Sequence, residues 1–148
     1  GSGVINQADF SRRWIAADGF GVLATLLRDP TCNIVTLDIS DLSDNFVFGD
    51  DCATVLADAL RSNCKLENLI LPHPSAVARK GWKAFVRALC DTSSINETYS
   101  SNHTLKNIGG RCPLNLRLRV SMLLNNDDRA NKKKVAIKKV LRYHRRFD

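Results

Sequence analysis

The stretch Cys52-Ala-Thr-Val-Leu-Ala-Asp-Ala-Leu-Arg61 decides how this chain is organised, because similar stretches lie on either side of it. It aligns without gaps with Gly19-Phe-Gly-Val-Leu-Ala-Thr-Leu-Leu-Arg28 and with Gly81-Trp-Lys-Ala-Phe-Val-Arg-Ala-Leu-Cys90, which start 33 residues before it and 29 residues after it. In each stretch the shared apolar positions fall at i, i+3, i+4 and i+7, which is one face of a helix. The sequence therefore predicts three helices that present the same apolar stripe at a nearly constant period.

A short apolar element follows each of the first two predicted helices. Residues 34–39 (Ile-Val-Thr-Leu-Asp-Ile) and 66–71 (Leu-Glu-Asn-Leu-Ile-Leu) carry apolar residues at relative positions 1, 4 and 6. Positions 4 and 6 share one face of a short strand, and positions 3 and 5 lie on the other face. We therefore expect one strand after each helix.

The third strand allows two placements. Residues 95–98 follow the third helix directly, but the positions after them are polar, whereas residues 101–108 parallel residues 62–69 of the preceding copy. We therefore place the third strand near residues 105–108. Residues 91–100 then form an insertion between helix and strand.

One helix and one short strand per roughly 30 residues make up the unit of a leucine-rich repeat. A single unit cannot cover its own apolar stripe, so stacked units share a core between a parallel sheet and a row of helices. Because helices are wider than strands, the stack is expected to curve. The predicted fold class is α/β: a short leucine-rich-repeat solenoid with parallel strands on the concave face, helices on the convex face and a helical C-terminal cap.

Motifs at the strand turn and the helix start accompany the repeat. They are residues 38–45 (Asp-Ile-Ser-Asp-Leu-Ser-Asp-Asn), Gly49-Asp-Asp51 and Ala53-x-x-Leu-Ala-x-Ala-Leu-Arg-Ser-Asn63. These segments resemble the ribonuclease-inhibitor subclass of leucine-rich repeats, in which an Asn closes the strand turn and Gly-Asp-Glu-Gly opens the helix. Here Cys52 replaces the second Gly, and one extra residue lies in 45–49.

A second set of segments narrows the resemblance. Residues 79–85, 90–95 and 101–105 are similar to leucine-rich repeat proteins that are abundant in some unicellular algae. Altogether the resemblance covers about residues 14–110. It implies a repeat fold and supplies no catalytic residue.

Charge divides the chain into two parts. Residues 1–100 hold 9 basic and 12 acidic residues, a net of −3, and residues 101–148 hold 13 and 3, a net of +10, which together give +7.

The repeat pattern stops after Gly110, where residues 114–124 predict a helix. Residues 125–128 predict a turn and helix N-cap, and a final helix is predicted from about Arg129. We expect a tag-like remnant at residues 1–3, about three repeat units over 4–110, and a basic helical C-terminal cap over 111–148.

The pattern of side chains indicates neither catalysis nor a bound metal or cofactor. The five cysteines form no Cys-x-x-Cys motif and no Cys/His pair with zinc-ligand spacing. Their odd number favours reduced thiols in a reducing compartment, although a disulfide between Cys32 and Cys64, at like positions of the repeat, stays open. Asp50 and Asp51 are predicted to satisfy the free amides of the helix that they begin. We expect a non-enzymatic, intracellular protein of the cytoplasm or nucleus.

No stretch of the sequence approaches the roughly 18 consecutive apolar residues of a membrane span. Two classes of function fit the predicted organisation. The first is a protein-interaction module whose concave strand face binds a protein partner, with an aromatic anchor in the insertion. Its predicted site residues are Thr36, Asp38, Asn68, Ile70, Asn107 and Tyr99.

The alternative is nucleic-acid or anionic-surface binding through the basic C-terminal helix, with salt-dependent phosphate contacts. Its predicted site residues are Lys132, Lys133, Lys134, Lys138, Lys139, Arg142, Arg145 and Arg146. A third interpretation also stays open, in which these charges pair with the acidic repeat section or solvate the outer face of the cap.

Overall fold

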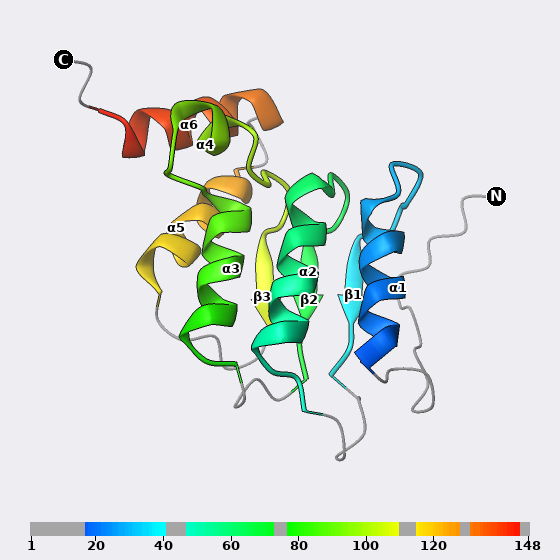
Figure 1. Ribbon diagram of the computed structural model, residues 1–148. Coiled ribbons are helices and arrows are strands. Elements are labelled where there is room, and N and C mark those ends of the chain that lie inside the picture. The colour runs from blue at the N-terminus through cyan, green and yellow to red at the C-terminus, as the bar shows by residue number, and fades with distance from the viewer. Residues whose placement is uncertain (1–16, 41–46, 73–76, 110–114, 128–130, 146–148) are drawn as a thin grey trace.

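The computed structural model describes residues 17–40, 47–72, 77–109, 115–127 and 131–145. Over these ranges it contains six helices and three strands, so the protein has a mixed α/β fold (Figure 1). In chain order the elements are α1 (Ala17–Arg28), β1 (Thr36–Asp38), α2 (Asp50–Ser62), β2 (Asn68–Ile70), α3 (Arg79–Leu89), α4 (Ile95–Tyr99), β3 (Asn107–Gly109), α5 (Leu116–Asn125) and α6 (Lys132–Tyr143).

The three strands form a parallel sheet in the order β1-β2-β3. Parallel neighbours need crossover connections, which here contain α2 between the first two strands, and α3 and α4 between the last two. The placement of the third strand near residues 105–108 is confirmed, because β3 begins at Asn107 and pairs with β2. The rejected segment 95–98 lies within the short helix α4, inside the predicted insertion.

Helices α1, α2 and α3 stand side by side against one face of the sheet (Figure 1), and α2 packs against both of its neighbours. The predicted apolar stripes are the buried faces of these helices. For example, Leu27, Leu60 and Leu89, which hold the same position in the three copies, are all fully buried. They face Leu37, Leu69 and Ile108 of the strands in one continuous core. Burying each leucine is worth roughly 1.5–3 kcal/mol, so this shared core stabilises the stack.

The acidic pair at the start of α2 does not act as predicted. The Asp50 carboxylate accepts hydrogen bonds from the backbone N–H groups of Ala78 (2.8 Å) and Gly81 (2.9 Å), which belong to the first turn of α3. Because α2 and α3 pack side by side, this carboxylate reaches the free amides of the neighbouring helix rather than those of its own. Asp51 instead points into solvent, with its side chain 98% exposed and 3.9 Å from the Lys80 ammonium.

Helices α5 and α6 follow the last strand. The predicted helix over residues 114–124 is confirmed in its main part as α5, whose Asn115 side chain caps it by accepting from the Leu118 N–H (3.2 Å). The predicted start of the final helix is wrong, because α6 begins at Lys132 and its N-cap is Asn131, which accepts from the Lys134 N–H (2.9 Å). Asn and Asp are about equally good N-caps, so composition alone did not separate the two positions.

The described cysteines are reduced. Cys32 is buried, Cys64 is exposed, and both are free thiols, so the disulfide left open between them is not formed. Burial raises the pKa of the Cys90 thiol, which keeps it protonated at neutral pH. Within the described residues no helix is long and apolar enough to cross a membrane.

Candidate binding surfaces

The sheet register gathers the predicted strand-face residues into two rows. Thr36, Asn68 and Asn107 lie opposite one another across the three strands. The second row consists of Asp38, Ile70 and Gly109. Of the five predicted residues in these rows, Asn107 is exposed and the other four are half-buried. The structure thus brings these five residues together on one face, which we call the strand face.

Polar contacts hold parts of the strand face in place. The Asn68 amide donates to the Thr36 hydroxyl over 3.4 Å, within the first row. The Asp38 carboxylate accepts from the Ser40 N–H (2.9 Å) and the Ser40 hydroxyl (2.6 Å), which forms a local turn. Asp38 therefore shapes the loop after β1 in addition to bringing an acidic group to the second row.

Tyr99 lies apart from both rows. It is the last residue of α4, a helix that packs against α6, and its side chain is 44% exposed. Its carbonyl is 2.8 Å from the Nε2 atom of His103. A role for Tyr99 as an anchor beside the strand face stays a prediction.

Most of the predicted cations of the C-terminal helix are exposed. Lys132, Lys133 and Lys134 occupy the first turn of α6, and Lys132 donates to the Cys64 carbonyl over 2.7 Å. Further along the helix Lys138 pairs with Asp127, while the guanidinium of Arg142 lies 5.9 Å from the centre of the Tyr143 ring. Arg145 is also exposed, and the predicted Arg146 lies outside the described residues.

The prediction that Lys139 is one of the anion-binding residues is wrong. Its side chain has no exposed surface, and its ammonium donates to the carbonyls of Leu89 (2.6 Å) and Asn102 (2.8 Å). Burial lowers the pKa of Lys139 to about 7, partly offset by the nearby Cys90. Lys139 therefore cannot contact an external anion, and it belongs to the interior of the protein.

Two buried asparagines make the same contacts in successive units. Asn63 donates to the Leu27 carbonyl near the C-terminal end of α1 (2.8 Å), and Asn102 donates to the Leu60 carbonyl near the C-terminal end of α2 (2.6 Å). The oxygen of each amide accepts from the backbone N–H groups two and three residues further on. The aligned segments 62–69 and 101–108 thus have equivalent structures.

Lys139 continues this series. Asn102 donates to the carbonyls of Leu60 and Asn63, and Lys139 donates to the carbonyls of Leu89 and Asn102, which hold the equivalent positions one unit later. We call Asn63, Asn102 and Lys139 the carbonyl ladder. Sequence reasoning missed the ladder, although the repeated Ser-Asn at 62–63 and 101–102 was a signal for its asparagines. Lys139 gave no such signal, because it is one of several lysines in the same helix and Lys138 stands directly beside it.

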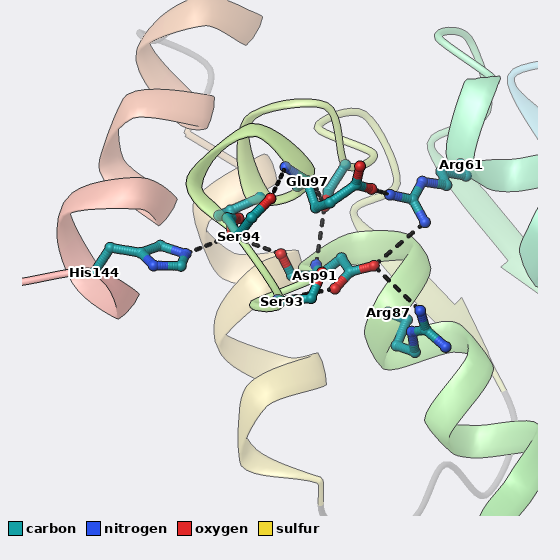
Figure 2. Close-up of polar contacts among 9 residues, drawn as sticks. Arg61, Arg87, Asp91, Ser93, Ser94, Glu97 and His144 are labelled. Carbon is teal, nitrogen blue, oxygen red and sulfur yellow. Dashed lines mark hydrogen bonds and ion pairs between the residues drawn. The ribbon is translucent and has the colours of Figure 1, made fainter.

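A buried carboxylate joins α2, α3 and α4 (Figure 2). Asp91 is 3% exposed, and its carboxylate lies 3.3 Å from the Arg61 guanidinium and 3.6 Å from that of Arg87. Burial opposes its ionisation, but hydrogen bonds from Ser93 and the charges of Arg87 and Arg61 outweigh burial and lower the pKa of Asp91. Arg61 also pairs with Glu97 of α4, so this cluster fixes the insertion on the two helices.

Thr98 and His144 have the separation of a nucleophile and a base, 2.8 Å between Oγ1 and Nε2. Figure 2 shows His144, at the end of α6, pointing toward α4. However, Thr98 has no exposed surface, and its hydroxyl also contacts the Asp91 carbonyl at 2.6 Å. Since no substrate can reach this hydroxyl, the pair serves to join α6 to the insertion.

His103 is a second half-buried histidine. Burial and the neighbouring Lys139 lower its pKa to about 4, so the ring is neutral at pH 7. Its Nδ1 atom is buried without a hydrogen-bond partner. No group of three or more His, Cys, Asp or Glu residues among those described could hold a metal ion.

No protein-family model matches this chain, and no curated protein matches it significantly.

Proposed function

We propose that the chain is a non-catalytic interaction module of leucine-rich-repeat type, whose strand face binds a protein partner inside the cell. The observation that carries this proposal is the pair of rows in register across the parallel sheet, where Thr36, Asn68 and Asn107 form one row and Asp38 and Ile70 lie in the next. Neighbouring strands stand about 4.8 Å apart, so the rows form a regular, shallow array.

The ladder supports the repeat-type interpretation. Asn63 and Asn102 make matching contacts, and the helices that precede them bury matching leucines. Repeated helix–strand units stacked in this way form extended binding faces in solenoid proteins. The free cysteines agree with a reducing compartment, which is why we place the protein in the cytoplasm or nucleus.

The chemistry of the strand face favours a peptide backbone or a polar protein surface as partner. The amides of Asn68 and Asn107 offer donors and acceptors, Asp38 offers an acceptor, and Ile70 offers an apolar contact. Because these groups lie on short paired strands, little conformational entropy is lost when they bind.

The test is affinity capture with the whole protein and with strand-face variants. Asn107→Arg changes an exposed side chain, and Asp38→Lys reverses the charge of the second row. We expect a specific protein that the wild type enriches to be lost with both variants and retained with Asp51→Lys, which reverses an exposed charge on α2. If all four proteins enrich the same partners, or none, the strand face is not the binding surface.

Nucleic-acid or anionic-surface binding through α6 is a second candidate. It is favoured by the exposure of Lys132, Lys133 and Lys134 in one helical turn. Duplex DNA should then bind with a log–log salt slope of about −0.9 for each phosphate neutralised. The double variant Lys133→Gln/Lys134→Gln should reduce the slope by roughly two, and an absence of binding at low salt would remove this candidate.

A further inference from the structure

A hollow lies where α5 meets α6. Its volume is about 410 Å³, and it is lined by Leu124 of α5 together with Lys138, Leu141, Arg142 and, just past the helix end, Arg145. Lys138, Leu141 and Arg142 have the spacing i, i+3 and i+4, so they lie on one face of α6, and Arg145 follows the helix end. This hollow is separate from the strand face.

The lining combines apolar and cationic groups. Leu124 is half-buried and Leu141 is 54% exposed, although leucine is usually an interior residue. Three cations surround these leucines, and no acidic residue belongs to the lining. Lys138 is paired with Asp127, whereas Arg145 makes no ion pair with any residue that the structure describes. The hollow therefore presents apolar surface beside two arginines, Arg142 and Arg145, that pair with no acidic residue among those described.

We propose that this hollow is a docking site for an acidic peptide segment of a partner protein, which inserts an apolar side chain between Leu124 and Leu141 and places carboxylates on Arg142 and Arg145. Charge complementarity selects an acidic partner. Arginine suits this role because its planar guanidinium can bind a carboxylate through two parallel hydrogen bonds.

The shape and chemistry of the hollow favour a peptide over other anions. A nucleic-acid backbone has phosphates for the arginines but brings no aliphatic group to the two leucines. A membrane would be met by projecting apolar side chains, whereas here the leucines line a hollow. Its volume lies at the small end of the roughly 300–1,000 Å³ range of ligand pockets, which suits one or two side chains.

The test uses fluorescence anisotropy with a labelled synthetic helical peptide that carries Leu along one face and Glu along the other. Matched peptides replace Leu by Ser or Glu by Gln. We expect the acidic leucine peptide to bind the whole protein at least tenfold more tightly than either matched peptide. Equal binding of the Ser peptide would overturn the proposal, because the apolar contact would then contribute nothing.

Variants of the protein locate the site. Leu141→Ala and Arg145→Glu should each weaken peptide binding at least fivefold, since both residues line the hollow and are exposed. Ile137→Ala and Lys133→Glu, also exposed on α6 but outside the lining, should change it less than twofold. An equal loss with Lys133→Glu would contradict the proposal, because it would indicate diffuse attraction to the whole helix.

Competition separates the other anionic partners. Duplex DNA and phosphatidylserine vesicles are added at matched charge concentration, and neither should displace the peptide at 150 mM salt. If either binds α6 more tightly than the peptide does and depends on Leu141, the docking site belongs to that anion and the proposal is wrong. The affinity-capture test of the strand face does not depend on any of these outcomes, so the two proposals can fail separately.

Discussion

The side chain of Asn102 makes four hydrogen bonds within the protein: two donated to the carbonyls of Leu60 and Asn63, and two accepted from the N–H groups of Thr104 and Leu105. Asn102→Ala leaves these buried groups without partners, and each unsatisfied group costs about 1–3 kcal/mol. We expect the free energy of unfolding to fall by about 3 kcal/mol or more, measured by urea denaturation.

Asn107 provides the matched control for this substitution. It is the same residue type, five positions further along the chain, but it is exposed on the strand face. Asn107→Ala should change the stability by less than about 0.5 kcal/mol. Equal losses from the two variants would show that the ladder contacts of Asn102 do not stabilise the fold.

Lys139 should make the stability depend on pH. In the unfolded chain it keeps its proton up to a pKa near 10.5, whereas in the folded protein burial lowers the pKa to about 7. Between these values the unfolded chain binds more protons, so stability rises with pH. A neutral amine still has two N–H groups for the Leu89 and Asn102 carbonyls. From pH 6 to 8.5 we expect wild type to gain on the order of 2 kcal/mol more than Lys139→Met.

The other titratable groups near Lys139 are present in both the wild type and Lys139→Met, so the difference between the two proteins reports on the lysine. His103 has a pKa of about 4 in the folded protein against 6.5 in the unfolded chain, so it also makes stability rise with pH over the lower part of this pH window, and burial raises the pKa of the Cys90 thiol above its ordinary value. Lys138→Met serves as control and should keep the wild-type slope, because Lys138 is exposed. An equal slope in the wild type and in Lys139→Met would assign the titration to another group.

At the scale of the helices, two glycines provide a direct comparison. A Cβ added at Gly81 in α3 would lie 2.7 Å from an Asp50 carboxylate oxygen and 2.9 Å from the Ala53 Cβ, whereas one at Gly21 in α1 meets nothing within 4 Å. Gly81→Ala should force α2 and α3 apart and lower the stability by roughly 1–3 kcal/mol. Gly21→Ala should raise it by about 0.5–1 kcal/mol, because alanine favours the helix.

Thermal or urea unfolding of the two variants measures this difference. If Gly81→Ala is as stable as the wild type, then α2 and α3 do not approach as closely as the Asp50 contact requires. Asp50→Ala gives an independent measure of the same contact. Asp50→Ala is expected to lower the free energy of unfolding by about 1 kcal/mol, because it removes a helix cap.

The elements themselves were largely predictable from the sequence. Periodicity placed α1, α2 and α3, because each has apolar residues at helical spacing, and Leu23, Leu56 and Phe85, which hold the same position in the three helices, are all buried. Helix ends were less predictable: residues 125–128 and Asn131 offer similar capping groups, and which one begins α6 depends on how the helix packs. The target of Asp50 was also hidden, since it lies on a neighbouring helix 28 residues away.

The strand-face residues could be predicted for a simple reason. Alternation along a strand assigns Thr36 and Asp38 to one face, and the parallel register then aligns them with Asn68, Ile70 and Asn107. The roles of the α6 cations could not be assigned in this way. Lys138 and Lys139 are adjacent and chemically identical, and only the packing of α6 on the ladder separates an exposed lysine from a buried one.

At the scale of the molecule, the units should be coupled to their neighbours and weakly to distant ones. Lys139→Met removes the bonds from α6 to the Leu89 and Asn102 carbonyls. We expect faster amide hydrogen exchange in α6 and α4, which pack together, and unchanged exchange in α1 and β1 at the opposite end of the sheet. A uniform acceleration over all elements would instead show that the protein opens as one cooperative unit.

The last position of the carbonyl ladder has a consequence for how such a chain can evolve. Lys139 offers donors to the Leu89 and Asn102 carbonyls just as Asn102 does to those of Leu60 and Asn63. An additional helix–strand unit inserted before the closing helices would present an equivalent pair of carbonyls to the lysine. Tandem duplication of a unit could therefore lengthen the protein, and enlarge its strand face, while the closing segment stays unchanged.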